Sequence, residues 1–246
     1  MKTLGGDQLL KMKFERLPVS DKWYPILGRI AAVFMACVYG ESGEGKTEFC
    51  ALLAAELANF GAVAWIGYET GHAADIQDVV VRNNLNKFPI SYSDPWQKLT
   101  PCTADFPQSK EKAVNALFGD LVNRMMKKKS PKYWFIDSAD ATRFTEEQII
   151  WLRAKFGTKK GIIFIAHAKG RVPEKAVSKK IEFYGHIGIY VKSYIAYPEK
   201  NRFSGRKPFI IWEEEARLRN PLFFEKQEAG SVTEPPKTKR TKKVKA

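Results

Sequence analysis

Eight consecutive residues carry the strongest chemical signal in this chain: Gly40-Glu41-Ser42-Gly43-Glu44-Gly45-Lys46-Thr47. Their spacing is G-x-x-x-x-G-K-[ST], the pattern of a loop that wraps the phosphates of a nucleoside triphosphate. Glycines let backbone N–H groups turn inward around the phosphates, where a Cβ would clash. Lys46 supplies a positive charge to the same phosphates, and Thr47 has a hydroxyl that can ligate Mg²⁺. We therefore predict that residues 40–47 bind ATP and Mg²⁺.

The segments on either side of this phosphate-binding loop (P-loop) have the character that the loop requires. Residues 31–39 form an apolar run of strand length, typical of a buried parallel strand. Residues 47–60 are good helix formers with an apolar stripe, and Gly61 ends the pattern. The order strand, loop, helix points the positive end of a helix dipole at the bound phosphates.

Three other predicted strand ends carry side chains that could act on a triphosphate. Asp137 closes an apolar strand, where a carboxylate can hold Mg²⁺ through water. Glu69 follows the strand after the P-loop helix, and it could orient and deprotonate the water that attacks the γ-phosphate. His167 ends a further strand and could sense the γ-phosphate, although an isolated histidine is as often structural.

The elements that must position these residues alternate along the chain. Strands are predicted at 62–67, 133–137, 161–167, 187–197 and 209–212, with helices at 73–85, 109–129 and 145–156 and a long loop at 87–108. This alternation predicts an α/β fold, with a mostly parallel twisted sheet flanked by helices and the ligand at the carboxyl ends of the strands. We expect a lead-in at 1–22, an ATPase core at 23–225 and a disordered basic tail at 226–246.

The net charge of +14 is concentrated in two segments. The last ten residues, 237–246, hold six positive charges and no acid. The segment 168–180 follows the predicted sensor and contains glycine and proline, so we predict a flexible basic loop there. Both segments could contact a phosphate backbone, or they could be merely solvated. The candidate nucleic-acid contacts in the loop are Lys169, Arg171, Lys175, Lys179 and Lys180.

Composition limits the location of the protein. No apolar run is long enough to span a membrane, and the first residues lack the apolar region of a signal peptide. Cys37, Cys50 and Cys102 have no zinc-like spacing and suggest no disulfide framework. We therefore expect a cytoplasmic protein without membrane contacts, located in the host cytoplasm if a phage encodes it.

The order of the motifs resembles the RecA-like core shared by the bacterial DNA-repair ATPase RadA (Sms) and by replicative helicases of the DnaB type. The likeness spans residues 23–225, and its most specific part is Lys200-Asn201-Arg202-Phe203, which resembles the K-N-R-F-G signature of RadA. In this chain Ser204 precedes Gly205, and Gly185-His186 stands where an aspartate is usual. The zinc knuckle and protease-like domain of RadA have no counterpart, so the chain is more similar to minimal ATPases of phages and mobile elements.

The resemblance implies an ATP-driven motor on DNA, favouring single strands: a helicase, a translocase, or a recombination or repair factor. It also implies a homo-oligomeric ring, with a hexamer favoured. Glu69 would be the catalytic base, and Lys200 and Arg202 would reach a neighbour's γ-phosphate as arginine fingers do. The alternative is a RecA-like ATPase switch or loader that acts on a protein partner. A small-molecule kinase would leave the basic segment and Lys200-Asn201-Arg202-Phe203 unexplained.

Overall fold

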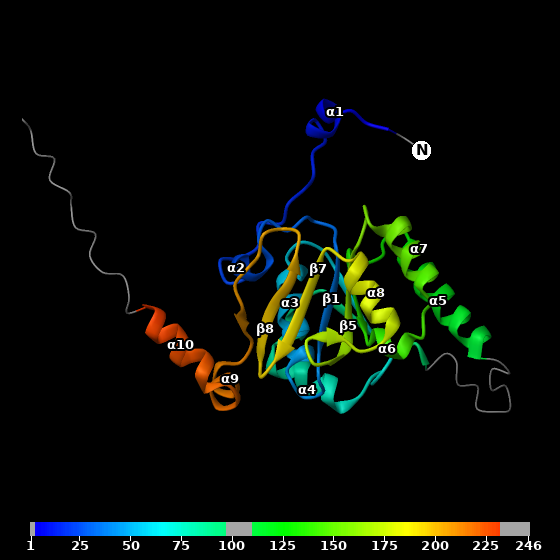
Figure 1. Cartoon of the computed structure of the whole chain (residues 1–246). Helices are drawn as coiled ribbons and strands as arrows, with labels where there is room; N and C mark the ends of the chain where they lie inside the picture. Colours follow the sequence, from blue (N-terminus) through cyan, green and yellow to red (C-terminus); the bar gives the residue numbers. More distant parts are fainter. Residues whose placement is uncertain (1–2, 97–109, 232–246) are drawn as a thin grey trace, which may run out of the picture.

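The computed structural model describes residues 3–96 and 110–231 and places a mixed β-sheet at the centre of the molecule (Figure 1). The strand order is β3-β2-β4-β5-β1-β7-β8-β9, and β6 pairs with β5 outside this path. The strands are β1 (Met35–Gly40), β2 (Val63–Gly67), β3 (Ile90–Ser93), β4 (Tyr133–Asp137), β5 (Gly161–Lys169), β6 (Val172–Pro173), β7 (Ile187–Lys192), β8 (Ile195–Asn201) and β9 (Phe209–Ile210).

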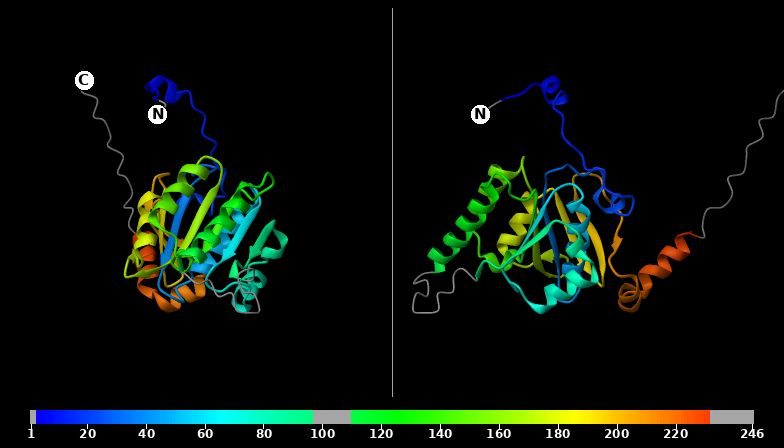
Figure 2. Two further views of the ribbon diagram at one scale, coloured as in Figure 1. Left: turned by 90° about the vertical axis from the view of Figure 1, so that its right-hand side faces the viewer. Right: turned by 180° about the vertical axis from the view of Figure 1, so that it is seen from behind.

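Helices cover both faces of this sheet, as Figures 1 and 2 show. They are α1 (Gly6–Leu10), α2 (Tyr24–Leu27), α3 (Lys46–Ala58), α4 (Ala74–Arg82), α5 (Lys110–Met126), α6 (Ala139–Thr142), α7 (Glu146–Phe156), α8 (Ala176–Tyr184), α9 (Glu213–Arg219) and α10 (Pro221–Ser231), with a short 3-10 turn at Leu85–Lys87. No helix in the described ranges is long and apolar enough to cross a membrane.

Alternation along the buried strands sends neighbouring side chains to opposite faces of the sheet. On β1, Ala36 and Val38 join the core cluster that includes α3, whereas Cys37 and Tyr39 join the cluster that includes α5, α7 and α8. Helix α4 packs on α3 through Val79, which shares a small apolar cluster with Ala51 and Leu85. The sheet therefore lies between two apolar layers, as expected for parallel strands.

Strand direction fixes where the functional residues meet. Strands β3, β2, β4, β5, β1 and β7 are parallel, so their carboxyl ends lie at one edge of the sheet. Gly40 at the end of β1 is in register with His167 of β5, and Gly67 at the end of β2 is in register with Asp137 of β4. An open α/β sheet binds its ligand at this edge. The predicted fold class is therefore confirmed, including the parallel strands whose carboxyl ends would form the ligand site.

The prediction of one strand over 187–197 is wrong, because the chain reverses at Ser193 and Tyr194 to form the antiparallel β7–β8 hairpin. Both turn residues have positive φ, 51° and 56°. Two-residue turns of this kind usually contain asparagine or glycine, and this sequence has neither there. The turn is instead held by tertiary contacts with the P-loop, which are described below.

The prediction of a flexible loop over 168–180 is also wrong. Strand β5 continues to Lys169 and pairs back with β6, and α8 begins at Ala176. Gly170 has φ 64° and lies in the turn between the two strands, so the glycine closes a hairpin here. The predicted helix at 145–156 is confirmed as α7, and it begins with a capping box: Gln148 N donates to Thr145 Oγ1 at 3.3 Å, and Thr145 N donates to Gln148 Oε1 at 3.0 Å.

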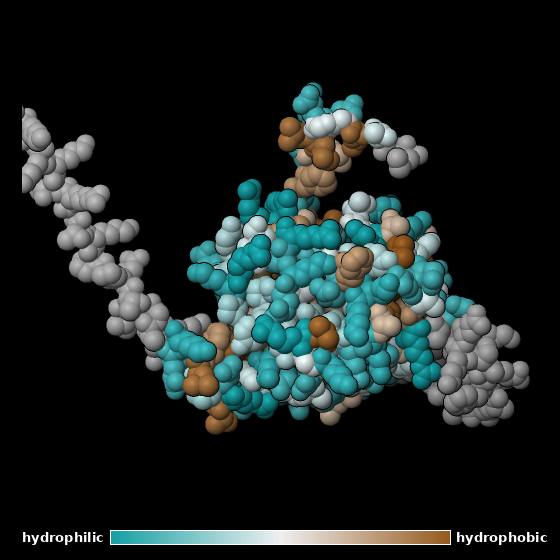
Figure 3. Space-filling view, in the orientation of Figure 1, coloured by the Kyte–Doolittle hydropathy of each residue, from teal (hydrophilic) through white to brown (hydrophobic). Residues whose placement is uncertain are grey.

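The two ends of the described chain extend away from the body of the molecule (Figures 1 and 2). Hydrophobic side chains gather on α1, which buries none of its residues, and Leu10 there is 84% exposed (Figure 3). At the other end, helix α10 runs to Ser231, so the expected tail at 226–246 begins with helix. The remainder of that predicted tail, 232–246, lies outside the described residues, as does the 97–108 part of the predicted long loop.

Candidate functional site

A cleft of about 380 Å³ opens at the carboxyl edge of the parallel strands. It brings together the P-loop, the ends of β2, β4 and β5, one side of α4 and the β7–β8 turn. Its lining residues are Ser42, Gly43, Gly45, Lys46, Thr47, Glu48, Glu69, Thr70, Asp75, Ile76, Asp78, Val79, Arg82, Asp137, Ser138, Ile165, His167 and Tyr194. Five residues of the predicted P-loop therefore face the same space as all three predicted strand-end residues.

The P-loop leaves β1 and enters α3 through two glycines with positive φ, Gly43 at 76° and Gly45 at 97°. These angles strain any residue with a Cβ, and at Gly45 a Cβ would also come within 2.8 Å of the Tyr194 ring. Lys46 Nζ donates to the backbone oxygen of Glu41 at 2.8 Å. Burial lowers the pKa of Lys46, while Asp137 and Glu69 oppose that effect. The Lys46 ammonium group therefore contacts the P-loop backbone and lies near the carboxylates of Asp137 and Glu69.

The other predicted P-loop residues support the loop from outside the cleft lining. Gly40 is the last residue of β1, and a Cβ there would approach the backbone oxygen of Val191 to 2.3 Å. Glu44 contacts the β7–β8 turn: its carboxylate accepts a hydrogen bond from Ser193 N, and its carbonyl accepts one from Tyr194 N at 3.1 Å. These contacts explain why a turn with two positive φ angles is stable without glycine.

Asp137 lies at the base of the cleft and is 9% exposed. Burial and the neighbouring Glu69 raise the pKa of Asp137 to about 6, and Lys46 partly offsets them. The backbone holds the two carboxylates together, because Glu69 N donates to the Asp137 carbonyl at 3.1 Å. Because burial and a neighbouring carboxylate disfavour the ionised form of Asp137, a cation bound beside it would stabilise that form.

Glu69 and His167 are in direct contact across the cleft, with His167 Nε2 3.1 Å from Glu69 Oε1 and 3.2 Å from Oε2. Burial favours the neutral form of Glu69, but the nearby Ser138 and His167 side chains outweigh it and lower the Glu69 pKa. The histidine is itself anchored, because its backbone N donates to Asp140 Oδ2 at 2.6 Å. A carboxylate that stays ionised has the protonation state that a general base requires.

The residues present fit a magnesium–triphosphate complex. In the described ranges no three His, Cys, Asp or Glu side chains form a metal-holding group, so the protein supplies no complete cage. Mg²⁺ needs none, since it is commonly bound by one or two protein ligands plus substrate phosphates. Thr47 and Asp137 both line the cleft and could provide these ligands. The buried Ser138 side chain also lines the cleft, beside Glu69.

Three of the five predicted nucleic-acid contacts already have acidic partners. Arg171 pairs with Glu199, Lys180 lies 3.0 Å from Glu146, and Lys175 lies 4.0 Å from Glu174. Lys175 and Lys179 are the N-cap and a first-turn residue of α8, and Lys169 is the last residue of β5. None of the five lines the cleft. The segment therefore presents less free positive charge than its sequence suggests.

Lys200 and Arg202 lie at the opposite edge of the sheet from the P-loop. Asn201, the end of antiparallel β8, is in register with Ile187 at the start of β7. Lys200 Nζ donates to the carbonyls of Glu182 and Phe183 at 2.6 and 2.7 Å, and so caps the end of α8. Neither residue reaches the cleft of its own chain, so their predicted catalytic role depends entirely on a neighbouring subunit.

Sequence reasoning missed several residues around the cleft. The sequence places Tyr194 within one predicted strand and gives no functional role to Glu48, Arg82 or Arg219. Asp140 links the site to α8, because its second carboxylate oxygen accepts a hydrogen bond from Ser178 Oγ at 2.6 Å. Of these residues, only Asp140 could be recognised from the sequence, because it lies three residues after Asp137.

Comparisons with known proteins show similarity of structure without similarity of sequence. Neither the protein-family models nor the curated proteins give a match. Among solved structures, the flagellar accessory protein FlaH from Methanocaldococcus jannaschii matches with a TM-score of 0.51 and 16% identity, covering 79% of this chain and 91% of FlaH. The KaiC-like protein PH0186 from Pyrococcus horikoshii OT3 matches with a TM-score of 0.55 and 15% identity, covering 79% and 92%. The chain thus has the RecA-like α/β fold, with a mostly parallel sheet, that these structures share.

Proposed function

We propose that this protein is a RecA-like ATPase that acts as a nucleotide-dependent switch or loader for a protein partner. The observation that carries the proposal is the meeting of Lys46, Glu69 and Asp137 in one cleft at the carboxyl edge of the sheet. Lys46 would bind the β- and γ-phosphates, and Thr47 and Asp137 would hold Mg²⁺. The metal, once bound, would neutralise charge that develops on the phosphates. Glu69 would take the proton from the attacking water.

The protein-partner part of the proposal is supported by two findings. The similar solved structures are a flagellar accessory protein and a KaiC-like protein. Within the structure, the predicted DNA-binding segment is largely paired with acids. A switch also needs a path from the nucleotide to a surface that a partner can contact.

Helix α9 provides such a path. Arg219 Nη1 donates to the carbonyl of Gly43 in the P-loop at 3.1 Å, and its guanidinium carbon lies 4.9 Å from the centre of the Tyr194 ring. Its Nε donates to Glu215 Oε2 on the same helix at 2.9 Å. Beyond this contact, Leu218 and Leu222 are 77% and 63% exposed. A change in the P-loop would therefore reach a surface with exposed apolar side chains.

Arg219→Ala is expected to separate nucleotide binding from the response of α9. Hydrogen–deuterium exchange should show that Mg·ATP slows exchange of residues 213–219 in the wild type, because phosphates order the Gly43 carbonyl that Arg219 contacts. The variant should bind Mg·ATP but show no such slowing. Arg217→Ala is the matched control, since Arg217 Nε donates to Glu213 of the same helix at 2.9 Å. Equal responses in both variants would remove Arg219 from the path.

A DNA motor remains the second candidate, and the net charge of +14 favours it. In that case the chain would assemble into a ring on single-stranded DNA, with Lys200 and Arg202 acting on a neighbour's nucleotide. ATP hydrolysis should then rise when single-stranded DNA is added, and the stimulation should fall steeply with salt. The switch predicts the same hydrolysis rate with and without DNA at both low and high salt.

A further inference from the structure

Glu48 is an acidic residue in an unexpected place for a triphosphate site. It directly follows Thr47, lies in the first turn of α3 and lines the cleft. Its side chain is only 14% exposed, so water screens its charge weakly. A carboxylate in this position would repel incoming phosphates unless another group neutralised it.

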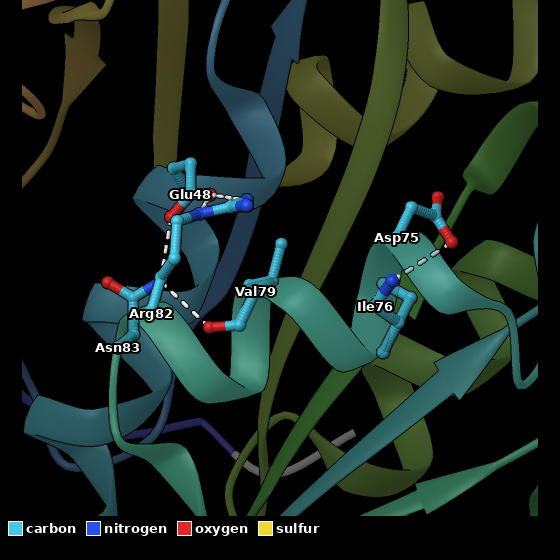
Figure 4. Close-up of polar contacts among 6 residues, drawn as sticks. All are labelled: Glu48, Asp75, Ile76, Val79, Arg82 and Asn83. Carbon is cyan, nitrogen blue, oxygen red and sulfur yellow. Dashed lines mark hydrogen bonds and ion pairs between the residues drawn. The ribbon is translucent and has the colours of Figure 1, made fainter.

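Helix α4 binds both oxygens of that carboxylate (Figure 4). Arg82 Nε donates to Glu48 Oε1 at 3.0 Å, and Arg82 Nη2 donates to the same oxygen. Asn83 Nδ2 donates to Glu48 Oε2 at 2.7 Å and to the Val79 carbonyl at 3.0 Å. Arg82 is the last residue of α4 and Asn83 its C-cap, so one helix end supplies all these donors.

The charge balance of the cleft shows why this arrangement matters. Among the described residues, five carboxylates line the cleft, whereas Lys46 and Arg82 are the only lysine and arginine in its lining. A site with this excess of acid is a poor acceptor for a triphosphate, even after Mg²⁺ has offset part of the charge. Removing Arg82 would leave Lys46 as the one lysine or arginine in the lining. The acidic residues are Glu48, Glu69, Asp75, Asp78 and Asp137.

We propose that Arg82 is a positioning residue that makes the P-loop competent for triphosphate by neutralising Glu48 and holding its carboxylate against α4. The inference rests on the proposed nucleotide site, and it assigns Arg82 an indirect role in which the guanidinium acts on Glu48 and not on the phosphates. The contact also ties the P-loop helix to α4, the helix that follows Glu69 in the chain. Nucleotide affinity therefore depends on a residue 36 positions beyond Lys46 in the sequence.

A double-mutant cycle with Mg·ATP tests this role. R82A should weaken binding on the order of tenfold, because it unmasks a poorly solvated carboxylate beside the phosphates. E48Q should bind somewhat more tightly than the wild type, since the amide removes the negative charge. The double variant E48Q/R82A should return to within about threefold of the wild type, because without the charge there is nothing to neutralise. The readout is the dissociation constant by titration calorimetry, with the thermal unfolding midpoint of each variant recorded.

Arg124→Ala is the matched control, since it also removes one arginine from an ion pair, here with Asp120 at 2.7 Å on α5. It should bind Mg·ATP as the wild type does. Wild-type affinity in folded R82A would overturn the proposal, and so would a double variant as weak as R82A, because Arg82 would then contact the nucleotide itself. A wild-type chain that binds no Mg·ATP would refute the proposed function directly, before any variant is compared.

Discussion

Glu69→Gln should bind Mg·ATP nearly as tightly as the wild type while its hydrolysis rate falls at least about a hundredfold. The amide has the size of the carboxylate but cannot accept a proton from water. The contact with His167 can persist, because the amide still offers one oxygen to Nε2. Steady-state phosphate release and calorimetric nucleotide binding measure the two quantities separately.

The matched control for this variant is Glu174→Gln, which makes the same change in charge on an exposed residue beside Lys175. It should hydrolyse ATP at the wild-type rate. Normal turnover in Glu69→Gln would mean that another group activates the water. The proposed role of Glu69 would then be wrong, although the nucleotide site itself could stand.

Lys46→Ala should lose both nucleotide affinity and hydrolysis, with turnover reduced at least about a hundredfold. The phosphates lose their main side-chain cation, and the cleft retains all its carboxylates. The fold should survive, because the hydrogen bond of Lys46 Nζ is made to the Glu41 carbonyl within the P-loop itself. Matching thermal unfolding midpoints would establish that the loss is local.

Lys159→Ala is the control for this prediction. Lys159 is an exposed residue between the end of α7 and the start of β5, and the cleft lies at the other end of β5. It should hydrolyse ATP normally. If Lys46→Ala turned over ATP at a rate similar to that of the control, residues 40–47 would not form the catalytic nucleotide site.

The parts of the site that the sequence predicts are those encoded by short segments. Residues 40–47 run from the end of β1 through a turn into the start of α3, and the sequence predicts this because glycine spacing and the flanking apolar patterns are local properties. The sequence also predicts that Asp137 and Glu69 share a sheet edge, because parallel strands bring their carboxyl ends to the same edge. Their backbones are joined by a hydrogen bond between Glu69 N and the Asp137 carbonyl.

The parts that the sequence does not predict depend on contacts between distant segments. The turn at Ser193 and Tyr194 carries no glycine or asparagine, and it is stabilised by Glu44, which lies 149 residues before Ser193. Arg82 and Arg219 look like ordinary surface arginines in the sequence, yet the fold brings them to Glu48 and Gly43. In the segment 168–180 the positive charges are visible in the sequence, but Glu199 and Glu146, which neutralise two of them, come from other elements.

The most direct test of a triphosphate site is to compare the binding of Mg·ATP and Mg·AMP to the wild-type protein by titration calorimetry. A P-loop that cradles the β- and γ-phosphates predicts that Mg·ATP binds at least about a hundredfold more tightly than Mg·AMP, which lacks both phosphates. Equal affinities for the two nucleotides, or no binding of either at millimolar concentration, would contradict the assignment of the cleft as a nucleotide site.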